Sequence, residues 1–232
     1  MRTVHAQPPD AAGSDDGLAW ALFVPDAPVS AGVVVLHGAG SRKESHFDFA
    51  RAARASGLAA LVFDARGHGS SDGPMDGRML KDVATMAGVL RREAGVGAVG
   101  LRGSSMGGWT ALAAAAGAGA GAVVAVCPAS GEGLLRGLRA GRFEFDADPE
   151  ALAPVFERAD LAGAAATLGP RLLLLHAEGD ETVPVEHSRE LHAAAPASKL
   201  VAIPGGHHRS IQHDPELQGV SIRFLARALA AT

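Results

Sequence analysis

Three segments of this sequence place a chemically reactive residue directly after an apolar run. Ser105 stands at the centre of GSSMG, and Asp180 follows RLLLLHAEG. Two adjacent histidines, His207 and His208, follow SKLVAIPGG. A hydroxyl, a carboxylate and an imidazole are the groups of a nucleophile, an orienting acid and a general base. These residue types predict nucleophilic catalysis through a covalent intermediate.

The segment GSSMG matches G-x-S-x-G, the pattern of a nucleophile elbow. An apolar run ends just before it and a helical pattern follows it, so Ser105 would sit on a strained strand-to-helix turn that exposes its hydroxyl. Ser104 would then belong to the turn itself. The chain contains 30 glycines, so this short pattern alone is weak evidence. The order Ser, Asp, His along the chain strengthens it.

The elements that must position these residues follow an alternating pattern. Near-continuous apolar runs, typical of strands covered on both faces, occupy 32–38, 57–67, 96–104, 121–128, 171–180 and 198–206. Helical patterns lie at about 45–56, 77–94, 106–118, 185–195 and 214–230. Together they predict an α/β fold with a mainly parallel sheet and helices on both faces. Ligands of such sheets bind at the carboxyl ends of strands, where the reactive residues stand.

Two segments depart from this alternation. Residues 18–24, LAWALFV, predict an antiparallel strand near one edge of the sheet. Residues 128–169 are too long for an ordinary connection and predict a small cap insertion with short helices around 131–140 and 149–160. We expect this insertion to limit the substrate to a short or medium acyl group. The sequence leaves open whether its large apolar residues pack in the core or line an acyl pocket: Leu134, Leu135, Leu138, Phe143, Phe145 and Phe156.

Composition bounds the class of protein. The chain of 232 residues fits one domain, 1–232, and 47% hydrophobic with 20% charged residues predicts a globular protein. The formal net charge is −4, which argues against a nucleic-acid partner because no basic field would neutralise phosphates. These features do not predict the oligomeric state.

The distribution of apolar residues and the cysteine content indicate the compartment. The N-terminal residues contain no apolar stretch typical of a secretory signal, and no uncharged apolar run reaches the roughly 18–20 residues that span a bilayer. The single cysteine, Cys127, excludes an intrachain disulfide and suits a reducing compartment. We therefore expect a cytoplasmic protein without a membrane partner.

The combined motifs resemble the α/β-hydrolase family over nearly the whole chain, from about residue 18. The resemblance is carried by VVLHGAG, FDARGHGSSDG, GSSMGG, GDETVP and PGGHH. It is closest to the compact dienelactone hydrolases and small carboxylesterases. Position 105 is serine, whereas the dienelactone-type nucleophile is cysteine, which favours ordinary ester hydrolysis.

The resemblance implies a role for each candidate residue. Ser105 would be the nucleophile, Asp180 the acid and His208 the base, with His207 as the competing histidine. Backbone N–H groups of Ala39 and Met106 would form the oxyanion hole, because they match the residue after His-Gly in the family's first loop and the residue after the nucleophile. It implies no cofactor and no metal ion.

The expected function is hydrolysis of small carboxylic esters or thioesters, with a small-molecule ester as the substrate. Two alternatives stay open. One is a cofactor-free haloperoxidase or perhydrolase that uses the same triad. The other is a catalytically inactive binding protein that keeps the hydrolase fold, although a pure binder has no need of all three residues.

Overall fold

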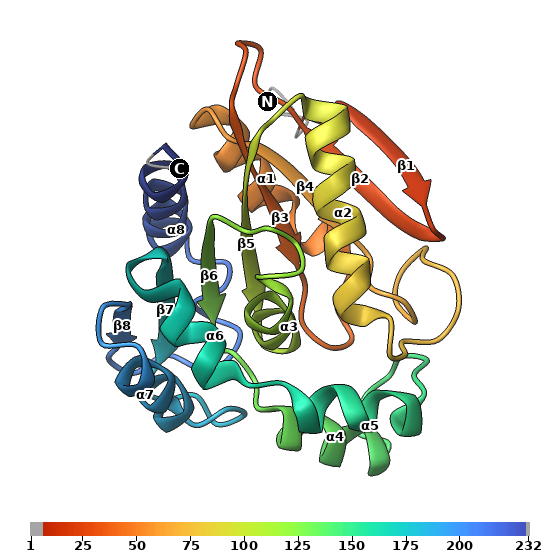
Figure 1. Cartoon of the computed structure of the whole chain (residues 1–232), viewed down its shortest axis with the longest axis vertical. Helices are drawn as coiled ribbons and strands as arrows, with labels where there is room; N and C mark the ends of the chain where they lie inside the picture. Colours follow the sequence, from red (N-terminus) through yellow and green to blue (C-terminus); the bar gives the residue numbers. More distant parts are fainter. Residues whose placement is uncertain (1–6, 231–232) are drawn as a thin grey trace, which may run out of the picture.

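A computed structural model describes residues 7–230, and an eight-stranded sheet runs through the middle of this part of the chain (Figure 1). The strands are β1 (Ala11–Asp15), β2 (Leu18–Phe23), β3 (Ala31–Leu36), β4 (Ala59–Phe63), β5 (Ala98–Ser104), β6 (Ala122–Val126), β7 (Leu172–Ala177) and β8 (Lys199–Ile203). Their order across the sheet is β1-β2-β4-β3-β5-β6-β7-β8. The ladders from β4 to β8 are parallel, which confirms the mainly parallel α/β sheet.

Helices cover both faces of the sheet. They are α1 (Phe47–Ala55), α2 (Met79–Ala94), α3 (Met106–Ala114), α4 (Gly131–Arg139), α5 (Pro149–Arg158), α6 (Leu161–Leu168), α7 (Val185–Ala194) and α8 (Pro215–Ala230). Short 3₁₀ turns occupy Lys43–His46 and Gly169–Arg171. Helices α1 and α8 pack together on one face, while α2, α3 and α6 belong to the other. Each face therefore has its own apolar cluster.

The expected strand at 18–24 is present as β2, and it lies one place in from the edge. The edge strand is β1, which pairs antiparallel with β2 through a two-residue turn at Asp16 and Gly17. Both turn residues have positive φ, 52° and 75°, as a type I′ turn requires. The Asp-Gly pair was the signal for this hairpin, because the β1 sequence AAGSD itself has little strand character.

The stretch between β6 and β7 holds three helices, one more than the sequence pattern indicates. Helices α4 and α5 pack against each other, at the expected positions. Helix α6 packs against α3 and α7, so it belongs to the layer that covers the sheet. Asp160 caps its first turn by accepting from the Gly163 N–H at 2.8 Å. Figure 1 shows α4 and α5 at one end of the sheet, beyond α3.

The structure bears on the expected domain bounds and on the expected absence of a membrane span only within the described residues. Residues 1–6 and 231–232, at the two ends of the expected single domain 1–232, lie outside the described residues. Within residues 7–230, no helix combines the length and the apolar character needed to cross a bilayer.

Close packing between β3, β5 and α3 depends on two glycines. A Cβ on Gly107 would clash with the backbone carbonyls of Leu36 and His37, and a Cβ on Gly103 would clash with the backbone of Gly107. Backbone atoms inside a sheet cannot move aside as the end of a flexible side chain can. Helix α3 therefore approaches the sheet this closely only because both positions are glycine.

We expect Gly107→Ala to lower the free energy of unfolding by about 1–3 kcal/mol, because the added methyl overpacks a rigid contact. Gly88→Ala is the matched control. Gly88 lies inside α2 with nothing within 4 Å of an added Cβ, so its substitution should stabilise by about 0.5–1 kcal/mol through helix propensity. Urea denaturation of the three proteins measures both effects, and equal midpoints would contradict the argument.

Candidate active site

Ser105 stands on a sharp turn between β5 and α3. Its backbone has φ 55° and ψ −118°, a conformation that non-glycine residues rarely adopt. The turn is held in place by the Ser105 N–H, which donates to Val126 O at 2.9 Å. The Ser105 carbonyl accepts from the N–H groups of Trp109 and Ala129 at 3.0 and 3.1 Å. The sequence-predicted strand-to-helix elbow is present, with Ser105 at its apex.

Asp180 and His208 meet through a direct hydrogen bond. Asp180 follows β7 and His208 follows β8, and the His208 Nδ1 lies 2.7 Å from Asp180 Oδ2. The other carboxylate oxygen, Oδ1, accepts from the N–H groups of Thr182 and Val183 at 2.9 and 2.8 Å. The Asp180 side chain is fully buried and that of His208 is 12% exposed. The carboxylate is therefore fixed, and it holds one edge of the imidazole.

The protonation state of Asp180 follows from these contacts. Burial alone would raise the pKa of this carboxyl, but hydrogen bonds from Val183 N–H and from His208 hold its pKa below the ordinary value. Asp180 is consequently an anion at neutral pH and can only accept hydrogen bonds. The neutral form of the His208 imidazole must then carry its proton on Nδ1, which leaves the electron pair on Nε2.

Two further side chains lie close to the Asp180 carboxylate. Cys127 and His176 are buried, and together with Asp180 they offer three potential metal-ligand atoms within 4.8 Å of one another. Both His176 nitrogens already have partners, Ser188 Oγ at 2.7 Å and Val183 O at 2.9 Å. Burial raises the pKa of the Cys127 thiol, so it stays protonated. We interpret this cluster as support for the carboxylate.

The structure separates the two adjacent histidines. His207 is exposed, and its backbone forms a small turn with Ser210. Its neighbour His208 turns toward Asp180. Among residues 7–230, no hydrogen bond joins the Ser105 hydroxyl to either histidine, a contact that often tightens only in the complex with substrate.

The loop after β3 lies against the elbow. A Cβ on Gly38 would come within 3.4 Å of the Ser105 Cβ and of Ser104 O. Within the described part of the chain, the backbone N–H groups of Ala39 and Met106 donate to no acceptor. The N–H of Gly40, the residue after Ala39, donates to His68. Two unengaged donors therefore remain beside Ser105, on the two residues predicted to form the oxyanion hole.

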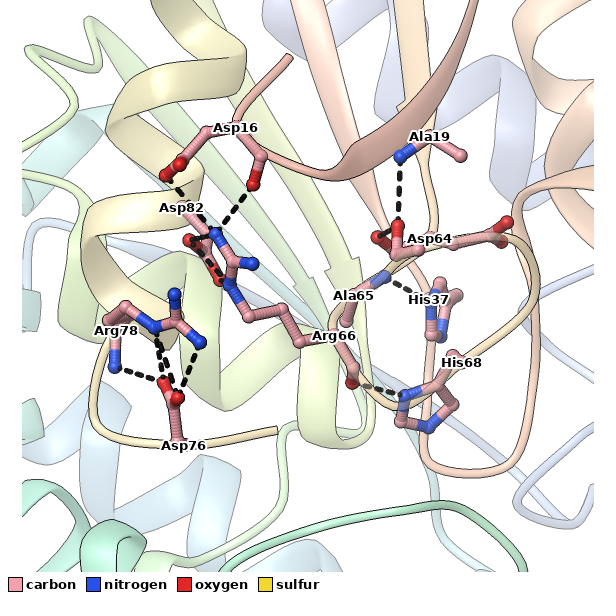
Figure 2. A network of polar contacts seen from close by, with 11 residues as sticks. Asp16, Ala19, His37, Asp64, Ala65, Arg66, His68, Asp76, Arg78 and Asp82 are labelled. Carbon is pink, nitrogen blue, oxygen red and sulfur yellow. Dashed lines mark hydrogen bonds and ion pairs between the residues drawn. The ribbon is translucent and has the colours of Figure 1, made fainter. Parts of the chain in front are cut away.

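Two neutral histidines hold this loop in shape. The His37 Nε2 accepts from Ala65 N–H at 3.0 Å, so its Nδ1 carries the proton and donates to Gly38 O at 2.8 Å. The His68 Nε2 accepts from Gly40 N–H at 3.1 Å. Figure 2 shows His37 and His68 side by side, with their rings 4.8 Å apart between centroids. Burial lowers the pKa of both, and that of His68 to about 4, so both stay neutral acceptors.

Comparisons with known proteins identify relatives of similar fold. Residues 27–140 match the model of a family described as serine aminopeptidase, S33. Est1E from Butyrivibrio proteoclasticus, whose structure holds ferulic acid, superposes with a TM-score of 0.74 at 21% identity, covering 95% of this chain and 99% of that chain. A monoacylglycerol lipase from Paleococcus ferrophilus gives 0.70 at 20% identity, covering 93% and 99%.

A third structure extends the likeness to the full length. XC6422 from Xanthomonas campestris, described as a serine hydrolase without a lid, has a TM-score of 0.65 at 20% identity and covers 99% of this chain and 100% of its own. The chain has the α/β-hydrolase fold. A comparison with curated protein sequences gives no match.

On this fold, a cleft of about 350 Å³ opens beside the loop after β3. Its lining includes Gly40 and Ser41 of that loop, His68, Phe145 of the insertion, and Arg209 next to His208. The Phe145 ring lies 4.0 Å from the His68 ring between centroids. Phe156, in contrast, packs edge-on against Trp109 in the core. The apolar residues of the insertion are thus divided between core and cleft.

A buried ion pair anchors the same loop from the other side. Asp64, at the end of β4, accepts from the Lys43 N–H at 2.7 Å and from Lys43 Nζ at 2.6 Å. The Asp64 side chain is fully buried and that of Lys43 is 11% exposed. Burial opposes ionisation, but the hydrogen bonds from Lys43 and Ser70 hold the pKa of Asp64 below its ordinary value.

Arg66 anchors the far end of that turn. Its guanidinium contacts Asp82 on α2 at 3.0 Å and Asp16 of the hairpin at 3.1 Å (Figure 2). Arg66 and Asp82 are both buried. The motif DARGHG therefore joins α2 and the β1–β2 hairpin to the loop beside Ser105.

We expect Lys43→Met to lower the free energy of unfolding by about 3–5 kcal/mol at pH 7, because it leaves the Asp64 carboxylate buried without its cation. Asp64 has a lowered pKa in the folded protein, so its contribution is present above the unfolded pKa and is lost as pH falls. The difference between the two proteins should therefore shrink as the pH falls below 3.8, the ordinary pKa of an aspartate. Lys81→Met, at an exposed position on α2, is the control. Urea denaturation across pH measures the difference, and a gap independent of pH would contradict the assignment.

Proposed function

We propose that this protein is a serine hydrolase that cleaves small carboxylic esters or thioesters, with Ser105 as nucleophile, His208 as base and Asp180 as orienting acid. The observation that carries the proposal is the 2.7 Å hydrogen bond from His208 Nδ1 to the buried Asp180. It stands at the same strand-end edge of the sheet as the strained Ser105. The order of the three residues along the chain is that of the α/β-hydrolase triad.

The chemistry follows from the protonation states. His208 Nε2 takes the proton of the Ser105 hydroxyl while the oxygen attacks the carbonyl carbon of the ester. The resulting imidazolium is stabilised by the Asp180 anion, and it then gives its proton to the leaving alcohol or thiol. Water attacks the acyl-enzyme in the same way, with His208 again as the base. The acid is released and Ser105 regains its proton.

The unengaged N–H groups of Ala39 and Met106 suit the charge that develops on the substrate oxygen. Backbone donors are fixed before the reaction begins, and each is typically worth about 3 kcal/mol of transition-state stabilisation. Gly40 cannot serve in the same way, because His68 already engages its N–H. The hydrogen bond from the Gly40 N–H to His68 therefore favours Ala39 as the donor within this loop.

The cleft supports a small substrate. Its volume of about 350 Å³ lies at the lower end of the range for small-molecule sites. Phe145 offers an apolar surface, while Ser41 and Arg209 offer polar groups. The proteins of similar fold are described as a ferulic-acid-bound Est1E and a monoacylglycerol lipase, which favours ester chemistry for this chain as well.

We expect Ser105→Ala to abolish labelling by a fluorophosphonate and to reduce kcat for p-nitrophenyl acetate by on the order of 10⁶, the loss found when another triad loses its serine. Ser104→Ala should keep labelling and turnover. The Ser104 hydroxyl is buried and has no hydrogen-bond partner in the described structure, so its removal leaves nothing unpaired. Labelling that persists without the Ser105 hydroxyl would exclude it as the nucleophile.

We expect His208→Ala to lose activity as Ser105→Ala does, because the His208 Nδ1 lies 2.7 Å from Asp180 Oδ2. The other imidazole near this oxygen in the described structure belongs to His176, which lies 3.5 Å away, is fully buried and has partners for both nitrogens. His207→Ala should retain most turnover, since its side chain is exposed. Steady-state kinetics of the two variants decide between them. Activity lost with His207 and kept without His208 would transfer the role of base.

A further inference from the structure

One arginine is buried in the middle of the sheet. Arg102 lies on β5 and is 1% exposed. No carboxylate pairs with it among the described residues, and its Nε and Nη1 have no hydrogen-bond partner there. The guanidinium carbon lies 4.3 Å over the ring of Phe49 on α1. A cation thus occupies a site that an apolar side chain would fill.

This burial is costly for the folded protein. Loss of hydration lowers the pKa of Arg102 to about 10, which still leaves it charged at neutral pH. Apolar residues of similar volume commonly replace buried charged groups with no loss of stability, or with a gain. Stability alone therefore does not account for arginine at this position, and its one hydrogen bond becomes the feature to explain.

That hydrogen bond joins the two halves of the proposed active site. Arg102 Nη2 donates to Gln212 O at 2.9 Å, across 110 positions of the chain. Arg102 is three residues before Ser105 on the strand that ends at the elbow. Gln212 is four residues after His208, in the loop between β8 and α8. No other side chain in the described structure hydrogen-bonds from β5 to this loop.

Two neutral histidines complete the surroundings of the arginine. The rings of His46 and His213 stack 5.8 Å apart between centroids. Burial, and then the charge of Arg102, lowers the pKa of His46 well below its ordinary value, and the same two causes lower that of His213. Both rings can therefore stay uncharged beside the cation. The Phe49 ring lies against the guanidinium, and both histidines are close enough for its charge to lower their pKa values.

We propose that Arg102 is a positioning residue that ties the loop carrying His208 to the strand carrying Ser105, and so sets the distance between base and nucleophile. The inference rests on the proposed function in its catalytic part. Its structural part, the tether between β5 and residues 204–214, stands on the hydrogen bond to Gln212 O.

The first measurement is the kinetics of Arg102→Met, which fills the volume but donates no hydrogen bond. We expect kcat for p-nitrophenyl acetate to fall on the order of 10- to 100-fold, because a small misplacement of a catalytic group costs up to about 10²-fold. KM should change less than about twofold, and the melting temperature should not fall. Arg102→Lys keeps a charged donor, so its kcat should lie between that of the wild type and that of Arg102→Met.

Arg91→Met is the matched control. Arg91 also donates to backbone carbonyls, those of Ala118 and Gly119, but it does so on α2 away from the proposed site. Its kcat should equal that of the wild type. A loss of kcat shared by both arginine variants would overturn the assignment of a specific role to Arg102.

The second measurement does not depend on activity. Arg209 is exposed and lies in the tethered loop, so trypsin cleavage after Arg209, followed by mass spectrometry, reports how often this loop opens. Cleavage should be on the order of 10-fold faster in Arg102→Met and unchanged in Arg91→Met. If Arg102→Met does not fold, the same pair of measurements on Arg102→Lys decides, with smaller changes expected in the same directions.

The two measurements separate the possible failures. Slower turnover together with faster cleavage supports the proposal. Either change without the other, or neither, overturns it. If the wild type shows no ester hydrolysis and no label on Ser105, the proposed function fails, while the cleavage rates still test the tether.

Discussion

The close approach of α3 to the end of β5 is the constraint on which the remaining structure depends. It forces Ser105 into a backbone conformation that costs on the order of 1–3 kcal/mol for a residue with a side chain. The glycines at 103 and 107 remove the atoms that would prevent that approach. The hydrogen bonds of the Ser105 backbone to Val126, Trp109 and Ala129 then hold the strained turn. A serine hydroxyl is thereby lifted from the sheet at a point where three strand-end loops converge.

Around this turn, buried polar groups fix the shape of the loops, which apolar packing alone would leave less specific. Asp64 with Lys43, and Arg66 with Asp82, fix the loops that end β3 and β4 by charge-assisted hydrogen bonds. Such pairs add little net stability compared with apolar residues, but their geometry is specific. Apart from Arg102 on β5, the protein therefore places these buried charges where loop shape matters, and most side chains on the faces of the sheet are apolar.

The sequence was sufficient for the sheet, for the elbow and for the order of the reactive residues. Buried strands such as β7 give continuous apolar runs, and a centred G-x-S-x-G between a strand and a helix has a direct structural meaning. It was insufficient for β1, whose residues have little strand propensity and whose pairing depends on the turn at Asp16 and Gly17. Helix α6 was also missed. The sequence of 128–169 indicates short helices, but it does not indicate that a third one follows α5 and packs on the layer that covers the sheet.

Long-range polar contacts were the other limit. Nothing local to Lys43 predicts that it meets Asp64, because the partners come from different loops and are brought together only by the order of β3 and β4 in the sheet. The same holds for Arg102 and Gln212, which lie 110 positions apart. The roles of Ser105, Asp180 and His208 remain predictions. The structure adds the hydrogen bond between two of them and the conformation of the third.

The buried histidines also couple the fold to protons. Burial lowers the pKa of His37, His46, His68 and His176 from 6.5 in the folded protein, and that of His68 to about 4. In the unfolded chain these histidines would be protonated below about pH 6.5, whereas in the folded chain they become protonated only at lower pH. Acidification in that interval therefore draws the equilibrium toward the unfolded chain by mass action. The same neutral imidazoles that shape the loop beside Ser105 give the protein an acid limit to its stability, set by proton uptake on unfolding.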